Sequence, residues 1–316
     1  MGPELSEAAA ARPGSTPIST ALQAAAAVSA APGWRVVLGV FKLRIGLLIM
    51  LTALAGLAIT PAPGLPVWQV LVMALTVLVS SASAGAFNQY IEADSDRLMR
   101  RTRRRAFATG ALAPTRAWPA LFVGLLGVSV ALAWVTLNAA TALFLFLGAF
   151  TYAVVYTVCL KRRTWLNIVI GGLAGSFAVL TGAAAVDPTP GALPLLLALV
   201  LFLWTPSHFW SLAIANRDDY AAAGIPMLPV VVGTARAARV VHANTWLLVV
   251  VSLLPAFFGA GPAYVAGALL GGAWFLRHTR ALARDPLRRT AMAAFFASMA
   301  QLSLLIVGVT LDAALR

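Results

Sequence analysis

Long apolar segments alternate with short polar ones along the chain, and the apolar segments have the length of membrane-spanning helices. A helix of about 20 apolar residues crosses the hydrocarbon core of a bilayer. Nine segments approach this length: residues 45–60, 66–87, 118–136, 141–159, 166–186, 192–213, 240–259, 262–276 and 291–311. The pattern predicts an all-α, polytopic membrane protein with a bundle of nine transmembrane helices.

The basic residues follow the same alternation. Of the 23 Lys and Arg residues, 22 lie before the first predicted helix or after the second, fourth, sixth and eighth, which leaves only Arg316 on the other side. Because Lys and Arg are enriched in cytoplasmic loops, the sequence predicts a cytoplasmic N-terminus and cytoplasmic basic loops. The opposite loops are nearly uncharged, and the loop after the fifth helix carries only Asp187. The expected location is the cell (inner) membrane.

Composition supports this class of protein. The chain is 61% hydrophobic and only 10% charged, which is typical of a membrane protein. Its net charge of +13 requires no nucleic-acid partner, since membrane orientation and contact with anionic lipid headgroups account for most of it. The single cysteine, Cys159, excludes an internal disulfide and a cysteine metal cluster within the chain.

The N-terminal segment differs from the rest. Residues 1–33 are rich in Ala, Pro and Ser and lack a basic start followed by an apolar stretch, so we expect a disordered tail and not a cleaved signal. The membrane domain is then residues 34–316. Within it, the small-residue pairs Gly171/Gly175 and Gly267/Gly271 predict close helix packing.

A dense charge cluster, NQYIEADSDRLMRRTRRR at residues 88–105, follows the second apolar segment. If the helix continues past residue 87, then Asn88, Glu92 and Asp96 lie one above another on one face, while Asp94 points elsewhere. A carboxylate at mid-bilayer costs about 2.5–3.5 kcal/mol. We therefore expect the carboxylates at the cytoplasmic interface or in a wet cavity.

Stacked carboxylates repel one another and need a counter-charge. Six arginines could supply it: Arg97, Arg100, Arg101, Arg103, Arg104 and Arg105. Mg²⁺ could also supply it, because this ion takes one or two carboxylates together with phosphate oxygens. Arginine forks bind phosphate oxygens two at a time. The pattern indicates a diphosphate site, and the alternative is an ordinary cytoplasmic loop whose arginines set the topology.

A second acidic site, Asp218 and Asp219, follows the sixth apolar segment on the same predicted side of the membrane. The two acidic sites could converge around one ligand. His208 lies about ten residues earlier, inside the membrane, where it is either a hydrogen-bonded core residue or a polar group in a ligand cavity. After the fourth segment, Lys161, Arg162 and Arg163 are either topology determinants or phosphate ligands.

These stretches resemble the UbiA-type intramembrane prenyltransferases and, within that family, the protohaem IX farnesyltransferases. The matching segments are NQYIEADSDRLMRRT (88–102), NIVIGG (167–172), LFLWTPSHFW (201–210) and DDYAAAGIPMLPVV (218–231). The resemblance implies that farnesyl diphosphate and haem B give haem O and diphosphate, with Mg²⁺ as cofactor. It also implies a bilayer setting and a product recipient such as a haem A synthase or a terminal oxidase.

The resemblance also implies roles for individual residues. Asn88, Glu92 and Asp96 would form the first metal and diphosphate motif, with Asp94 nearby, and Asp218 and Asp219 would form the second. Phosphate oxygens would be held by Arg101, Arg105, Lys161 and Arg162. His208 would be a candidate for haem contact.

The chain departs from the family pattern at several positions. Members usually have Asp where this chain has Glu92, and prolines are replaced at Leu43, Ala106, Trp165, Ser207, Ala178 and Val179. These departures leave room for another acceptor, such as a quinone precursor or a chlorin. A transporter is a third reading, but transporters place ionisable groups near the membrane midplane, whereas these acids cluster at helix ends.

Overall fold

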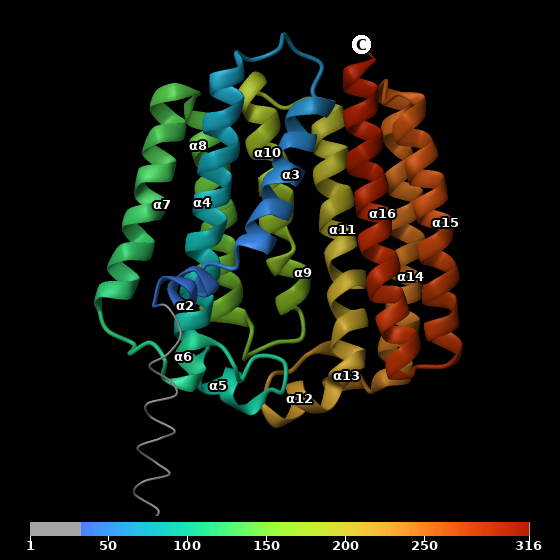
Figure 1. Ribbon diagram of the computed structural model, residues 1–316. Coiled ribbons are helices and arrows are strands. Elements are labelled where there is room, and N and C mark those ends of the chain that lie inside the picture. The colour runs from blue at the N-terminus through green and yellow to red at the C-terminus, as the bar shows by residue number, and fades with distance from the viewer. Residues whose placement is uncertain (1–32, 316) are drawn as a thin grey trace, which may run out of the picture.

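The computed structural model describes residues 33–315, and within them every regular element is helical (Figure 1). The predicted tail therefore lies outside the described residues, except for Gly33. The first half contains α2 (Gly33–Val40), α3 (Leu43–Ile59), α4 (Val67–Ile91), α7 (Ala117–Thr136), α8 (Ala139–Phe150), the π-helix η1 (Thr151–Leu160), α9 (Asn167–Gly171) and α10 (Leu173–Val186). The second half contains α11 (Ala192–Ala215), α14 (Thr234–Leu253), the 3₁₀ turn η2 (Leu254–Phe258), α15 (Pro262–Arg284) and α16 (Arg288–Ala314).

Seven helical segments are long and apolar enough to cross a membrane, and α2 with α3, bent by 42° at their junction, could form an eighth span. The helix α15 is not among them. Its C-terminal half carries Arg277, His278 and Arg280, which lower its apolar character. The bundle is thus all-helical as predicted, while the number of nine spans stays a prediction.

The outer surface of the long helices is apolar. Val123, Val135 and Phe257 are all exposed by more than 60% of their area. Exposed apolar surface of this extent is unfavourable in water but favourable against lipid tails. The exposure pattern is therefore that of a protein embedded in a bilayer.

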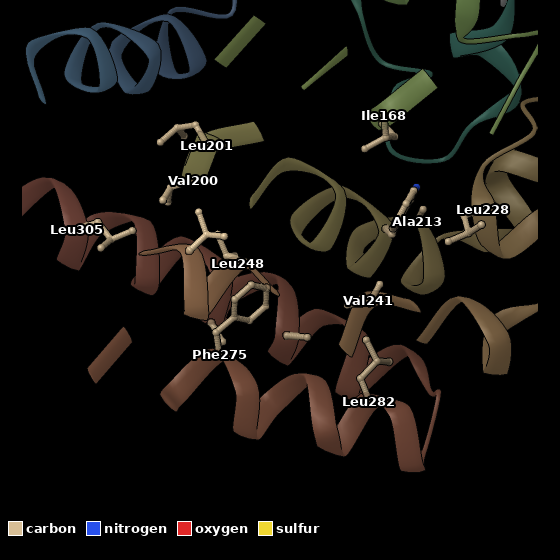
Figure 2. Packing of buried hydrophobic residues seen from close by; sticks show 14 of the residues in the cluster. Ile168, Val200, Leu201, Ala213, Leu228, Val241, Leu248, Phe275, Leu282 and Leu305 are labelled. Carbon is tan, nitrogen blue, oxygen red and sulfur yellow. The ribbon is translucent and has the colours of Figure 1, made fainter. Parts of the chain in front are cut away.

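The main core lies between the C-terminal helices. Val200 and Leu201 from α11, Leu248 from α14 and Phe275 from α15 are buried together (Figure 2). Leu305 contributes from α16. This core packs α11 against the last three helices, and the end of α11 and the start of α16 consequently line one cleft.

Helices α3 and α10 cross at very close range. A Cβ atom at Gly182 would lie 1.7 Å from the carbonyl oxygen of Ala53, and one at Gly56 would lie 2.0 Å from that of Val179. Only glycine permits this backbone approach. Packing at Gly267 and Gly271 against α16 is confirmed, whereas Gly175 has nothing within 4 Å of an added Cβ.

Four short helices gather at one end of the bundle: α5 (Ala93–Leu98), α6 (Ala106–Thr109), α12 (Arg217–Ala222) and α13 (Leu228–Val232) (Figure 1). The arginine-rich segment after α4 and the acidic segment after α11 both emerge here. Residues more than 100 positions apart are consequently brought to one end, where the candidate site lies.

Candidate functional site

The three residues predicted to share a helix face do so. Glu92 sits at the junction of α4 and α5, and its backbone N–H still bonds to Asn88 O at 3.0 Å while Asp96 N bonds to Glu92 O at 2.8 Å. The helical rise therefore continues through the junction. Asn88, Glu92 and Asp96 are only 3%, 2% and 2% exposed, whereas the side chain of Asp94 is 88% exposed and pairs with Arg97.

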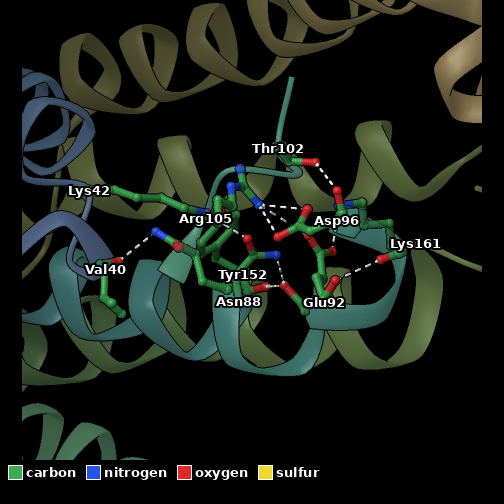
Figure 3. Close-up of polar contacts among 12 residues, drawn as sticks. Val40, Lys42, Asn88, Glu92, Asp96, Thr102, Arg105, Tyr152 and Lys161 are labelled. Carbon is green, nitrogen blue, oxygen red and sulfur yellow. Dashed lines mark hydrogen bonds and ion pairs between the residues drawn. The ribbon is translucent and has the colours of Figure 1, made fainter. Parts of the chain in front are cut away.

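Two cations neutralise the buried carboxylates (Figure 3). The Nη1 of Arg105 donates to Asp96 Oδ1 at 2.9 Å and to Oδ2 at 2.7 Å, and it lies 3.9 Å from Glu92 Oε2. Lys161 Nζ forms an ion pair with Glu92 Oε1. Buried charges are stable only when paired in this way. The side chain of Glu92 is one methylene longer than that of the expected Asp, and its carboxylate still pairs with Lys161.

Lys42 is a site residue that sequence reasoning did not identify. Its Nζ donates to Asn88 Oδ1 at 2.6 Å, and Asn88 Nδ2 in turn donates to Thr157 Oγ1 at 3.1 Å. Lys42 is also the one non-glycine residue with positive φ among residues 33–315, at φ 48° and ψ 43°. Such strain in a non-glycine residue is commonly found at functional sites. The contact joins positions 46 residues apart, so no local pattern could reveal it.

The π-helix η1 forms another wall of the site. Its five-residue hydrogen-bond step, seen between Lys161 N and Tyr156 O at 2.8 Å, brings residues four and five apart onto one face. Tyr152 and Tyr156 stack with their ring centroids 5.7 Å apart, and Lys161 Nζ lies 5.7 Å from the Tyr156 centroid. Long π-helical segments are rare and occur frequently at functional sites.

The second acidic site contacts the same loop system from the other side. Arg100 Nε lies 3.3 Å from Asp219 Oδ1, while Asp218 is largely exposed and lies 3.6 Å from Arg217. Arg162 donates to Ser95 Oγ at 3.3 Å. Both acidic segments therefore lie at one end of the molecule, while their convergence around one ligand stays a prediction.

A cleft of about 740 Å³ opens beside this junction. Arg100 and Arg101 line it from the loop after α5, and Asp218 and Asp219 line it from α12. Asn88, Glu92 and Asp96 do not line the cleft. The five predicted metal ligands thus fall into two groups separated by the loop of residues 99–105, because Arg105 and Thr102 from this loop bond to Asp96.

The donor types suit Mg²⁺, a hard cation that prefers carboxylate and amide oxygens. Within residues 33–315, no three His, Cys, Asp or Glu side chains lie close enough to hold a metal by themselves.

His208 lies in the interior between α11 and α16. Its ring stacks between Trp204, at 4.2 Å between centroids, and Phe295, at 4.5 Å, and its Nδ1 is 2.7 Å from Ser298 Oγ. These contacts match the reading of a hydrogen-bonded core residue. Haem contact by His208 stays a prediction.

Burial shifts the ionisation of two groups at this end. It lowers the pKa of Lys161 below 10.5, and the Glu92 carboxylate opposes this effect. It raises the pKa of Tyr220, and the nearby Arg101 guanidinium opposes that shift. Tyr220 therefore stays neutral and can donate a hydrogen bond.

An all-helical bundle with an apolar exterior and charged side chains gathered at one end is typical of a membrane-embedded protein. The family model for the UbiA prenyltransferase family matches residues 49–300, and the chain belongs to this family.

Two relatives align over nearly their full length. The chain is 56% identical over 278 residues to Protoheme IX farnesyltransferase 2 of Paramagnetospirillum magneticum, covering 88% of this chain and 96% of the relative. It is 40% identical over 282 residues to Protoheme IX farnesyltransferase of Stutzerimonas stutzeri, covering 88% and 93%.

Solved structures share the fold. Digeranylgeranylglyceryl phosphate synthase aligns with a TM-score of 0.74 at 15% identity, over 90% of this chain and 99% of that chain. A UbiA homologue from Archaeoglobus fulgidus bound to DMAPP and Mg²⁺ aligns with a TM-score of 0.68 at 15% identity, over 85% and 99%.

Proposed function

We propose that this chain transfers the farnesyl group of farnesyl diphosphate to a vinyl group of haem B, with addition of water, to give haem O and diphosphate. The observation that carries the proposal is the buried face of Asn88, Glu92 and Asp96 with its cations Arg105 and Lys161. The names of the relatives, Protoheme IX farnesyltransferase, support the choice of donor and acceptor.

The reaction needs a stabilised leaving group and a dry cavity. When the farnesyl C1–O bond breaks, its electron pair leaves with the diphosphate, and Arg105 and Lys161 stabilise the negative charge that develops there. An apolar surrounding excludes water while the vinyl carbon bonds to farnesyl C1. Water then adds to the adjacent cationic carbon and loses a proton, which leaves the hydroxyl of haem O.

Mg²⁺ belongs to the same proposal. Its proposed ligands are Asn88, Glu92 and Asp96 in the first acidic segment and Asp218 and Asp219 in the second, while Arg101 and Arg162 would bind phosphate oxygens. When bound, Mg²⁺ neutralises part of the diphosphate charge. The structure of a UbiA homologue bound to DMAPP and Mg²⁺ supports Mg²⁺ as the cofactor. Asp94 lies nearby, but its side chain is exposed and pairs with Arg97.

We propose that nine helices span the cell inner membrane, with α2–α3 as one bent span and α15 as another. The charged end would face the cytoplasm, as the positions of the basic residues favour. A haem A synthase or a terminal oxidase would receive the product.

The direct test is expression in cells that lack their own haem O synthase, followed by mass analysis of the extracted haems. We expect a species with the mass of haem O. Folded protein in membranes containing haem B but no haem O would refute the assignment of the acceptor, and a prenylated quinone precursor or chlorin would then replace it.

A further inference from the structure

The cleft at the end of the bundle carries more positive charge than its own carboxylates neutralise. Four arginines line it, Arg100, Arg101, Arg217 and Arg288, against the two aspartates Asp218 and Asp219. The formal excess is two positive charges. Arg100 pairs with Asp219, and Arg101 is proposed above to bind phosphate oxygens. Arg217 and Arg288 are therefore left for the acceptor, one for each group if the acceptor has two carboxylates.

The arginines differ in how far they are already paired. Arg100 pairs with Asp219 at 3.3 Å, and Arg217 lies 3.6 Å from Asp218 and donates to Pro229 O. Arg288 forms no ion pair or side-chain hydrogen bond with any residue in the range 33–315. Its neighbour Arg289 points elsewhere and pairs with Asp285 at 3.1 Å.

The position of Arg288 separates it from the proposed diphosphate site. Arg105 and Lys161, which neutralise Glu92 and Asp96, come from the first half of the chain and do not line the cleft. Arg288 begins α16 and lies on the wall formed by the second half, where Arg217 is its basic companion. Arg101, proposed above to bind phosphate oxygens, lines the cleft from the loop after α5, so Arg217 and Arg288 are the cleft arginines that remain for the acceptor.

The same wall has an apolar part. Met292, one turn after Arg288 on α16, and Leu212 on α11 both line the cleft. A flat apolar macrocycle with carboxylates along one edge matches this combination. In haem B the propionates and the vinyl groups lie on opposite edges, so propionates held at the cleft would direct the vinyl edge away from Arg288.

We propose that Arg288, with Arg217, binds the propionate carboxylates of the haem acceptor and so orients its vinyl edge for prenylation. The inference rests on the proposed function, because it assigns the acceptor subsite of that reaction. Planar arginine forks bind carboxylates with two parallel hydrogen bonds, which suits this role.

The test compares Arg288→Gln with Arg289→Gln, an adjacent arginine outside the cleft. Both variants and the unsubstituted protein are assayed in membranes for KM toward haem B, haem B dimethyl ester and farnesyl diphosphate. We expect Arg288→Gln to raise the KM for haem B roughly tenfold, as for loss of one charge-assisted contact. The KM for farnesyl diphosphate should stay unchanged, and Arg289→Gln should behave like the unsubstituted protein.

The ester makes the test specific for the carboxylates. The unsubstituted protein should bind the ester more weakly than haem B, and Arg288→Gln should not weaken binding of the ester further. Equal haem KM values in both variants, or a rise confined to farnesyl diphosphate, would overturn the propionate site while haem O is still formed. If the unsubstituted protein forms no haem O at all, the proposed function itself fails.

Discussion

Arg100 and Asp219 lie 119 positions apart in the sequence, yet the backbone N–H of Arg100 donates to Asp219 Oδ2 at 3.2 Å. The guanidinium of Arg100 approaches the other carboxylate oxygen, Oδ1, at 3.3 Å. The loop that contains Arg100 also contains Arg105, which pairs with Asp96. One loop therefore contacts both acidic segments, and its position couples them.

Lys42 offers a test that separates backbone strain from side-chain chemistry. Its positive φ favours glycine, so Lys42→Gly should be more stable than Lys42→Ala by about 1 kcal/mol. Both changes remove the ammonium that bonds to Asn88, so both should lower turnover. Thermal unfolding in detergent and farnesyl transfer assays measure the two effects, and equal stability of the variants would contradict the strain argument.

The lowered pKa of Lys161 predicts a pH dependence. The ammonium is present below its pKa in the fold, so activity that needs this charge should fall as pH rises, at a pH below 10.5. Lys161→Arg keeps its charge at every accessible pH, so any activity it retains should lack this alkaline loss. Alkaline limbs at the same pH in both proteins would contradict the assignment.

The same shift has a consequence for stability. Between the lowered folded pKa and the unfolded value of 10.5, the unfolded chain binds the extra proton. The contribution of Lys161 to the free energy of unfolding should therefore increase with pH across that interval, and the contribution from Arg in its place should not change.

The crossing of α3 and α10 predicts a stability difference between two glycines on one helix. Gly182→Ala would place a Cβ 1.7 Å from Ala53 O, so the helices must move apart, at a cost of about 1–3 kcal/mol or more. Gly175→Ala meets nothing within 4 Å and should be neutral or slightly stabilising. Thermal unfolding in detergent compares them, and equal midpoints would refute the close crossing.

The sequence predicted those parts of the site that depend on local spacing. Asn88, Glu92 and Asp96 lie on one face because the helical rise continues across Glu92, and Asp94 points away, as the four-residue spacing requires. Most of the long helices begin or end within a few residues of the predicted limits. Two helices are longer than predicted: α14 begins at Thr234 and not near residue 240, because Arg236 and Arg239 interrupt the apolar pattern. Helix α15 ends at Arg284 and not near residue 276, because Arg277 and Arg280 interrupt it.

Local spacing in the sequence could not predict the contacts between distant segments. Lys42 reaches Asn88 from a bend that no periodicity marks, and Tyr152 enters the site through a π-helix whose sequence is an ordinary apolar run. Three of the positions where prolines are replaced can be compared with the structure. Helix α10 runs without interruption through Ala178 and Val179, and Ser207 uses its hydroxyl to accept a hydrogen bond from Asn244 at 2.8 Å.

The most direct test of the central claim compares farnesyl transfer by Asp96→Asn and Asp94→Asn in membranes. The claim is that the buried face of Asn88, Glu92 and Asp96 holds the diphosphate end of the donor. Asp96→Asn should lower turnover on the order of 100-fold or more, because it removes the carboxylate that positions Arg105 and would bind Mg²⁺ at the leaving group, while the exposed Asp94→Asn should retain nearly full turnover. Equal turnover by the two variants, with both folded, would contradict the claim.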